Sequence, residues 1–424
     1  MQTKKPANLK IFGFNKTLVK YISASYLAIP VSLITGFIAF RNIDPYFMGV
    51  WSALTVFETY AVFLRMGIVN GMNRELPYSL GKNDVDSANK YAETTLAYTL
   101  FDIILLILIV PIVIWKSDFN DVHLVGICVS VTRVIITFYI TYLAATFRSE
   151  DNFNKLSNIQ LIMLLIKLGL CPLVLLGFNG FLLYELLMVV GNVILLHWQR
   201  PFKSLKPKFH YAEFTQLFKI GFPIFLSSYI ISFIDTMPRL FIIKNSDEKT
   251  LGIYAPVIML LGTVAILPNT LSTYLYPKFS FNLGKTNDPR NIFTNLLKIY
   301  AVSFIVILIL VIIGYFLLDF FIAFFPKYTD SLPYLKLALL ICPFVFFRLG
   351  NMFNVVIKKY SYMFAFVIIY GITQFLSLYM LSIYISDVLD IVIYSQIITS
   401  VVILIISILM NYMLIKNIEK VSLI

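Results

Sequence analysis

Five basic side chains lie inside segments that are otherwise apolar enough to cross a lipid bilayer. They are Arg65, Arg133, Lys167, Arg239 and Arg348. A cation at the bilayer centre costs about 2.5–3.5 kcal/mol on insertion scales, so five that faced lipid would cost roughly 12–18 kcal/mol. We therefore expect these side chains to face a hydrated internal cavity. Such a cavity favours an anionic cargo, because a guanidinium can grip a phosphate through two parallel hydrogen bonds.

Three carboxylates lie equally deep in apolar segments, and a fourth, Glu185, lies about one turn from a helix end. The three are Glu58, Asp102 and Asp235. They are the candidate proton or sodium sites of a transporter driven by an ion gradient. Asp235 and Arg239 are four residues apart, a spacing that lets them pair on one helix face. Glu58 and Arg65 are two turns apart and are expected to share a face as well.

Two interpretations of the buried cations stay open: ion pairs that hold helices together, or direct contacts with the cargo. Arg133 and Arg348 are the favoured cargo contacts, because each lies near the middle of its helix with no carboxylate one turn away. Arg239 is the cation that we expect Asp235 to neutralise. Lys167 is a further point charge for the cargo. Aromatic faces suit sugar rings, and the candidate cavity tyrosines are Tyr139, Tyr142, Tyr229 and Tyr370.

The composition is that of a polytopic membrane protein. Of 424 residues, 59% are apolar and 13% charged, and the mean hydropathy is +0.85, whereas soluble domains carry about 25% charged residues. The first apolar stretch is too long for the core of a signal peptide and is interpreted as a spanning helix. The three cysteines and three histidines form no ligand pattern, so we expect no disulfide, no metal site and no cofactor.

Twelve apolar windows are long enough, at about 20 residues each, to cross the hydrocarbon core. They fall at residues 18–40, 46–70, 91–115, 122–147, 158–178, 180–198, 217–243, 251–276, 294–318, 332–357, 361–385 and 388–415. The sequence therefore predicts an all-α membrane protein with about twelve transmembrane helices. Because the number is even, both termini are expected on the same side.

The distribution of basic residues indicates which side that is. The segments on the side of the termini hold 23 lysines and arginines, and the opposite connections hold six. By the positive-inside rule, both termini are expected in the cytoplasm. The opposite connections are too short to contain a catalytic domain.

The two halves of the chain share local sequence at one offset. Gly49, in Met-Gly-Val-Trp, corresponds to Gly252, in Leu-Gly-Ile-Tyr, and Gly81, in Leu-Gly-Lys-Asn-Asp, corresponds to Gly284, in Leu-Gly-Lys-Thr-Asn-Asp. Both pairs are 203 residues apart. Six helices per repeat preserve orientation, so the repeat is parallel. We expect two six-helix lobes, 1–205 and 206–424, around a central cavity used for alternating access.

These features resemble the O-antigen and polysaccharide flippases (Wzx type) of the multidrug/oligosaccharidyl-lipid/polysaccharide (MOP) exporter superfamily. The resemblance rests on the 6+6 plan, on Gly-Ile-Val-Asn-Gly-Met-Asn-Arg at 67–74, on Ser-Leu-Gly-Lys-Asn-Asp at 79–84 and on its counterpart at 282–288. It extends over essentially the whole chain through loose motifs.

The resemblance implies a flippase of the bacterial inner membrane. It would move an undecaprenyl-pyrophosphate-linked oligosaccharide, for O-antigen (lipopolysaccharide) or another surface polysaccharide, to the outer leaflet. Its cationic cavity would contain Arg65, Arg133, Lys167, Arg239 and Arg348. The polysaccharide polymerase and other assembly proteins would be its partners. No Gly-x-x-x-x-Gly-Lys-Ser/Thr motif is present, so the energy would come from a proton or sodium gradient or from consumption of the glycan.

Three alternatives remain. A cation-coupled drug exporter of the same fold would use the carboxylates rather than the arginines. A major-facilitator transporter is disfavoured, because 81–84 lacks the arginine cluster of that class and the central loop at 199–216 is short. A membrane glycan polymerase or ligase would carry a long external loop, which this sequence does not provide.

Overall fold

The computed structural model describes residues 16–115, 120–150, 152–202, 205–286, 289–357 and 359–422, and every regular element in these ranges is a helix. The α-helices are α1 (Lys16–Asn42), α2 (Pro45–Ala61), α3 (Ile68–Gly81), α4 (Val85–Trp115), α5 (Asp121–Ser149), α6 (Phe153–Leu170), α7 (Gly177–Trp198), α8 (Tyr211–Asn245), α9 (Glu248–Thr286), α10 (Pro289–Ile322), α11 (Leu332–Leu339), α12 (Leu349–Val356), α13 (Tyr360–Tyr384) and α14 (Val388–Ser422). The 3₁₀ helices are η1 (Val62–Arg65), η2 (Cys171–Leu176), η3 (Pro326–Ser331) and η4 (Cys342–Arg348).

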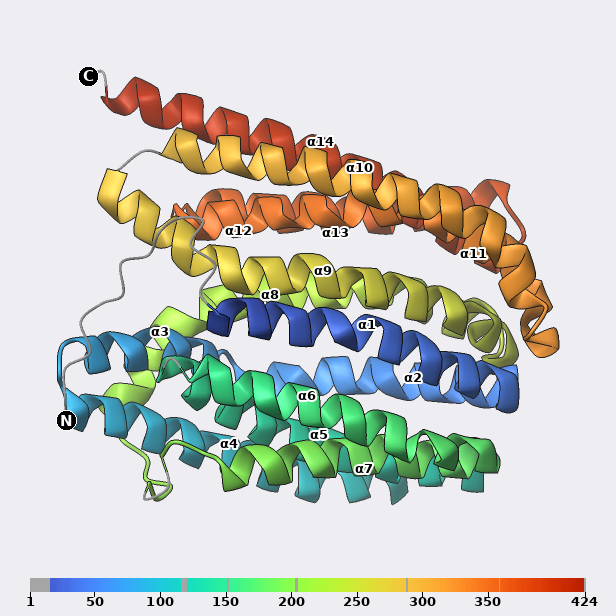
Figure 1. Ribbon diagram of the computed structural model, residues 1–424, viewed down its shortest axis with the longest axis horizontal. Helices are drawn as coiled ribbons and strands as arrows, with labels where there is room; N and C mark the ends of the chain where they lie inside the picture. The colour runs from blue at the N-terminus through green and yellow to red at the C-terminus, as the bar shows by residue number, and fades with distance from the viewer. Residues whose placement is uncertain are drawn as a thin grey trace.

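The described chain contains ten stretches that are long and apolar enough to span a bilayer, or eleven when the bent pair 326–339 and 342–356 is taken as one span. One of the ten, 153–198, has 46 residues. A straight helix of that length would measure about 69 Å, more than twice the hydrocarbon thickness of about 30 Å. It folds back instead as α6 and α7, which pack together (Figure 1). The hairpin therefore crosses twice, and the predicted twelve crossings and all-α class are confirmed.

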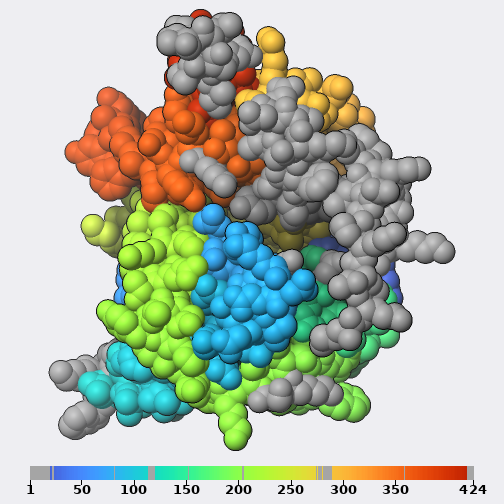
Figure 2. All heavy atoms as spheres, turned by 90° about the vertical axis from the view of Figure 1, so that its left-hand side faces the viewer, coloured from blue at the N-terminus to red at the C-terminus, as the bar shows by residue number. Residues whose placement is uncertain are grey.

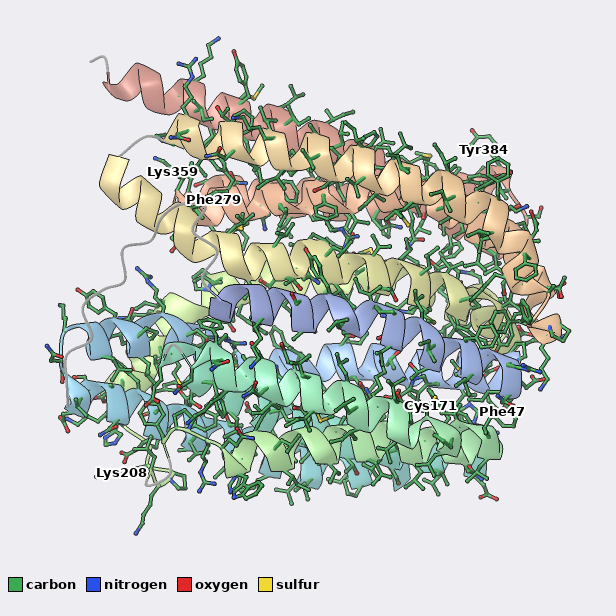
Figure 3. All side chains as sticks on the ribbon, in the orientation of Figure 1. Phe47, Cys171, Lys208, Phe279, Lys359 and Tyr384 are labelled. Atoms are coloured by element: carbon green, nitrogen blue, oxygen red, sulfur yellow. The ribbon has the colours of Figure 1, made fainter. Side chains whose placement is uncertain are left out.

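All the long helices run roughly parallel to one direction, which is horizontal in Figure 1. We call the end where α1 begins and α14 ends the terminal end, and the other the far end. Lys208 and Lys359 lie at the terminal end, whereas Phe47 and Tyr384 lie at the far end (Figure 3). Helices α1–α7 occupy the lower part of Figure 1 and α9–α14 the upper part, with α8 between them.

The helices α2 and α9 cross in backbone contact at the far end. A Cβ atom on Gly49 would lie 1.6 Å from the carbonyl oxygen of Glu248, and one on Gly252 would lie 1.7 Å from that of Pro45. Gly49 corresponds to Gly252 in the sequence repeat, and Pro45 corresponds to Glu248 at the same offset. The two contacts are thus equivalent, which indicates a pseudo-two-fold axis through this crossing and supports the parallel repeat.

Helix α8 contacts both groups of helices. Near its start it crosses α3, where a Cβ on Gly221 would lie 2.1 Å from the carbonyl oxygen of Gly67, and Gln216 hydrogen-bonds with Tyr91 and Glu75. Figure 2 shows α8 and α3 side by side on the terminal face. Its second half packs against α13 and α14. The boundary between lobes at residues 205 and 206 stays a prediction.

The second spanning segment is broken. A single helix over 46–70 was expected, but α2 ends at Ala61, η1 follows, and α3 begins at Ile68. The expectation is wrong because Met66 (φ 42°) and Gly67 (φ 78°) both adopt the left-handed conformation, which glycine tolerates and an α-helix cannot include. At the equivalent position of the repeat, α9 has Thr270 and continues unbroken.

The tenth segment, predicted at 332–357, is broken as well. The axes of 326–339 and 342–356 differ by 52°, and η4 begins at Cys342 with Pro343 next. Proline cannot donate the hydrogen bond that an α-helix would require there. This break places Arg348 at the last residue of η4.

Candidate functional site

A cavity of about 550 Å³ lies between α2, η1, α5 and α8; we call it the central cavity. Two of the five predicted cations, Arg65 and Arg239, line it together with Glu58. Its remaining polar wall is formed by Thr55, Thr59, Asn70, Thr137, Thr141, Ser228, Tyr229 and Ser232. The structure thus places a cationic, hydroxyl-lined space within the membrane-spanning helices.

Arg65 reaches this cavity from the break after α2. Its guanidinium carbon lies 4.4 Å from the centre of the Phe138 ring. Nε and Nη2 are buried and have no hydrogen-bond partner among the residues that the structure describes. Asp102 on α4 interacts with Arg65 electrostatically, but no ion pair within 4.0 Å joins the two. Arg65 therefore brings a positive charge to the cavity wall that no ion pair within 4.0 Å neutralises among the described residues.

Arg239 enters the cavity from α8 and donates a hydrogen bond from Nη1 to Oγ1 of Thr55, at 2.9 Å. We expected Asp235 to neutralise it; Asp235 interacts with Arg239 electrostatically, but no ion pair within 4.0 Å joins the two. Asp235 accepts hydrogen bonds from Arg348 Nη1 at 2.8 Å and from the Tyr370 hydroxyl at 2.5 Å instead. Two cross-helix donors thus replace the local pair. Within the described ranges, Arg239 has no carboxylate partner within 4.0 Å.

Asp235, Arg348 and Tyr370 form a closed triad, because Arg348 Nη2 also donates to the Tyr370 hydroxyl at 3.0 Å. The triad borders a second cavity of about 200 Å³, whose polar wall includes Gln374, Gln396, Thr399 and Ser400. The side chains of Arg348 and Asp235 are 37% and 36% exposed, which places them on the surface of this cavity. Arg239 lines both cavities, so the two are neighbours.

Arg133 belongs to an ion-pair network rather than to a cavity wall. Its Nε lies 3.2 Å from Oε1 of Glu58, and its Nη1 contacts Glu185 on α7. The guanidinium also lies 4.8 Å from the Trp51 ring centre. No carboxylate lies one turn away on its own helix, but α2 and α7 each supply one. This geometry favours the interpretation that Arg133 joins three helices, and its contact with the cargo stays a prediction.

Of Lys167, Asp102 and Glu58, it is Glu58 that lines the central cavity. Lys167 on α6 donates to Ser32 on α1 at 2.9 Å and lines neither cavity. Asp102, 2% exposed, is buried in α4 behind Arg65. Glu58 accepts a hydrogen bond from Ser130 at 3.2 Å and pairs with Arg133. Glu58 and Arg65, which were expected to share a helix face, both line the central cavity, although the helix tightens to 3₁₀ at Val62.

Sequence reasoning missed the hydroxyl wall. Its members form pairs four residues apart on three helices: Thr55 and Thr59, Thr137 and Thr141, Ser228 and Ser232. A repeated i, i+4 pattern of hydroxyls in apolar helices would have revealed it, because such pairs share one helix face. Of the four candidate tyrosines, Tyr229 lines the central cavity and Tyr370 the second. Tyr139 hydrogen-bonds His197 elsewhere, and Tyr142 is buried.

A family model described as a polysaccharide biosynthesis protein matches residues 46–325. The comparison with curated proteins finds no match.

Solved structures of transporters share the fold. An outward-facing multidrug resistance MATE family transporter of the MOP superfamily is 15% identical, with a TM-score of 0.70 and coverage of 96% of each chain. An inward-facing one is 14% identical, with a TM-score of 0.69 and coverage of 96% of this chain and 99% of that one. A MOP superfamily transporter from Pyrococcus furiosus, described as having a binding pocket of reverse polarity, is 15% identical over 95% of this chain and 96% of that one, with a TM-score of 0.60. The chain therefore has the fold of this transporter superfamily.

Proposed function

The chain belongs to the family of polysaccharide biosynthesis proteins, and we propose that it is a flippase for oligosaccharides linked to a polyprenyl diphosphate. It is a multi-pass membrane protein with the fold of MOP-superfamily transporters. The cargo would be a repeat unit of O-antigen or of another surface polysaccharide. The protein would expose its cavity to one side of the membrane and then to the other.

One observation carries this proposal: Arg65 and Arg239, which have no ion-pair partner among the described residues, line one hydroxyl-rich cavity. A diphosphate offers the oxygens that guanidinium groups bind most strongly. The hydroxyls of the wall can exchange hydrogen bonds with a glycan, whose own hydroxyls need partners once they leave water. A cationic drug would meet repulsion at the same place.

The excess of basic residues at the terminal end supports an orientation. By the positive-inside rule, that end lies in the cytoplasm of a bacterial cell, in the inner membrane. Lys208 and Lys359 mark this end in Figure 3. The cargo would enter from the cytoplasmic leaflet and leave to the outer one, where a polymerase or another assembly protein would use it.

Glu58, Asp102 and Asp235 are the groups proposed to bind a coupling proton or sodium ion. Glu58 lines the central cavity and Asp235 lines the second cavity, and Arg239 lines both. A gradient of either ion would supply the free energy, together with consumption of the glycan on the outer side.

The test is to deplete the protein in its host and to quantify polyprenyl-diphosphate-linked oligosaccharide in each leaflet. A flippase predicts complete single repeat units accumulating on the cytoplasmic face. Accumulation on the outer face would indicate a polymerase instead. No change in either leaflet, together with export of cationic dyes that depends on the carboxylates, would indicate a cation-coupled drug exporter.

A further inference from the structure

A cavity at the far end of the bundle has no role in the mechanism described so far; we call it the far-end cavity. It has a volume of about 650 Å³ and lies between α2, α4 and α5 on one side and the turn from α8 to α9 on the other. Its walls are apolar: Val50, Ala53, Leu54, Phe57, Leu106, Ile109, Val110, Ile127, Val131, Ile243 and Leu251. Its polar rim consists of Asn120, His123, Ser246, Asp247 and Glu248.

The far-end cavity continues the central cavity along two helices. On α8, Arg239 lines the central cavity and Ile243, four residues later, lines the far-end cavity, so the two share a helix face. On α5, Val131 lines the far-end cavity and Val134, three residues later, lines the central cavity. One helical turn, about 5.4 Å along the axis, therefore separates the two lining sets on both helices.

The far-end cavity also borders the lipid. Three of its large apolar side chains are exposed on the protein surface: Phe57 by 40%, Ile109 by 44% and Ile243 by 42%. Ile109 belongs to a lipid-facing stretch of α4 that includes Ile107, Leu108 and Ile112. An apolar molecule can therefore enter this space sideways from the bilayer.

We propose that the far-end cavity holds the isoprene units nearest the diphosphate of the cargo, while the diphosphate lies at Arg65 and Arg239. The proposal rests on the proposed function, since it requires a polyprenyl cargo. An apolar cavity of about 150 Å³ holds one benzene, so on that scale 650 Å³ holds about 25 carbon atoms, or about five isoprene units. The chain is bound by burial of apolar surface, which is roughly proportional to the area removed from water.

The charges of the rim determine which part of the cargo enters. Asp247 and Glu248 lie at the mouth with His123, whose Nε2 is 3.9 Å from Oε1 of Glu248. Two carboxylates repel a diphosphate at this position. The anionic part therefore stays one turn away at Arg239, and the uncharged chain fills the apolar space.

The experiment compares two ligands on the purified full-length protein in phosphatidylcholine nanodiscs. Inorganic pyrophosphate probes the cation pair alone, and geranylgeranyl diphosphate adds a chain of four isoprene units. The wild-type protein should bind the second at least about tenfold more tightly, because apolar burial adds to the same ionic contacts. Ile127→Trp should fill the far-end cavity and remove this advantage, and it should leave pyrophosphate binding unchanged.

Val125→Trp is the matched control, because Val125 lies on the same helix, is 48% exposed and does not line the cavity. It should alter neither affinity. An undiminished advantage for the isoprenoid in Ile127→Trp would overturn the proposal and leave the proposed function intact. If phosphatidylglycerol added to the nanodisc abolishes the advantage in the wild type, the cavity holds ordinary lipid and the proposal fails. Absence of pyrophosphate binding in the wild type would instead overturn the proposed function itself.

Discussion

Gly49 and Gly252 occupy equivalent positions of the sequence repeat, and each packs against the backbone that precedes the other. The carbonyl oxygens of Glu248 and Pro45 lie 1.6 Å and 1.7 Å from where their Cβ atoms would be. No side chain fits at either position. The far ends of α2 and α9 are therefore held as close as two helices can approach.

Gly252→Ala should destabilise the protein by about 1–3 kcal/mol, the usual cost of overpacking a tight interior. The measurement is the thermal unfolding of the purified protein. The matched control is Gly262→Ala on the same helix, where a Cβ meets nothing within 4 Å. It should be neutral or stabilise the helix by about 0.5–1 kcal/mol. Equal stability of the two variants would show that the α2–α9 crossing is looser than described.

Arg65→Gln and Arg239→Gln should each weaken pyrophosphate binding by at least about tenfold, because a hydrogen bond to a charged group contributes about 1.5–3 kcal/mol. Neither substitution removes an ion pair within 4.0 Å in the part of the chain that the structure describes, so the unfolding temperature should not fall. Lys208→Gln, at an exposed cation near the terminal end, is the control for net charge. Unchanged pyrophosphate affinity in both variants would show that the central cavity does not bind the anion.

Arg133→Gln should behave in the opposite way and reduce stability by about 1–3 kcal/mol, less than a fully buried pair would lose, because it leaves two partly buried carboxylates without their cation. Those carboxylates belong to Glu58 and Glu185. The triple variant with Glu58→Gln and Glu185→Gln should recover most of the loss. If Arg133→Gln is stable but inactive in transport, Arg133 contacts the cargo rather than holding the helices together.

Asp235 and Arg348 should show a coupling energy of about 0.5–3 kcal/mol in a double-mutant cycle of Asp235→Asn and Arg348→Gln. We expect a coupling energy near the lower end of that range, because both side chains are more than a third exposed and solvent weakens an exposed ion pair. The pair Glu58→Gln and Arg348→Gln, which share no contact among the described residues, should be additive. Arg348→Ala should in addition abolish glycan export at normal membrane levels. Normal export would exclude Arg348 from the transport cycle.

Thr137→Val with Thr141→Val should weaken transport of the glycan more than binding of pyrophosphate. Both hydroxyls line the central cavity, and each hydrogen bond lost to a sugar costs about 0.5–1.5 kcal/mol. Transport should fall by about tenfold, and pyrophosphate affinity should stay within about twofold. Thr215→Val, on α8 outside the cavity lining, is the control. An equal loss in both assays would mean that these hydroxyls contact the phosphates.

The number of membrane crossings, the all-α fold class and the internal repeat could all be predicted from the sequence. Lipid imposes a length and a polarity on each spanning segment, and both are visible in the sequence. The breaks at Met66–Gly67 and at Pro343 could not be located by hydropathy, since apolar residues continue through both. Glycine and proline were visible in the sequence, but neither signals the left-handed conformation of the non-glycine residue Met66.

The set of intramembrane charges was predicted, but their pairing was only partly so. Spacing along one helix predicted that Asp235 could pair with Arg239 and that Glu58 would share a face with Arg65. Both carboxylates instead bind arginines from other helices, Arg348 and Arg133. Such contacts depend on tertiary packing, which periodicity within one helix does not encode. The two arginines left without ion pairs could therefore be identified only from the structure.

The triad at Asp235 also has a consequence for biosynthesis. Arg348 follows Asp235 by 113 residues and Tyr370 follows it by 135. At about 5–20 residues per second, the ribosome adds Arg348 about 6–23 s after it has added Asp235. During that interval α8 has Arg239, four residues along the same helix, as the nearest cation to Asp235. The second half of α8 can meet α2 early, through Arg239 and Thr55, but it completes its native contacts only when the last two helices have been made.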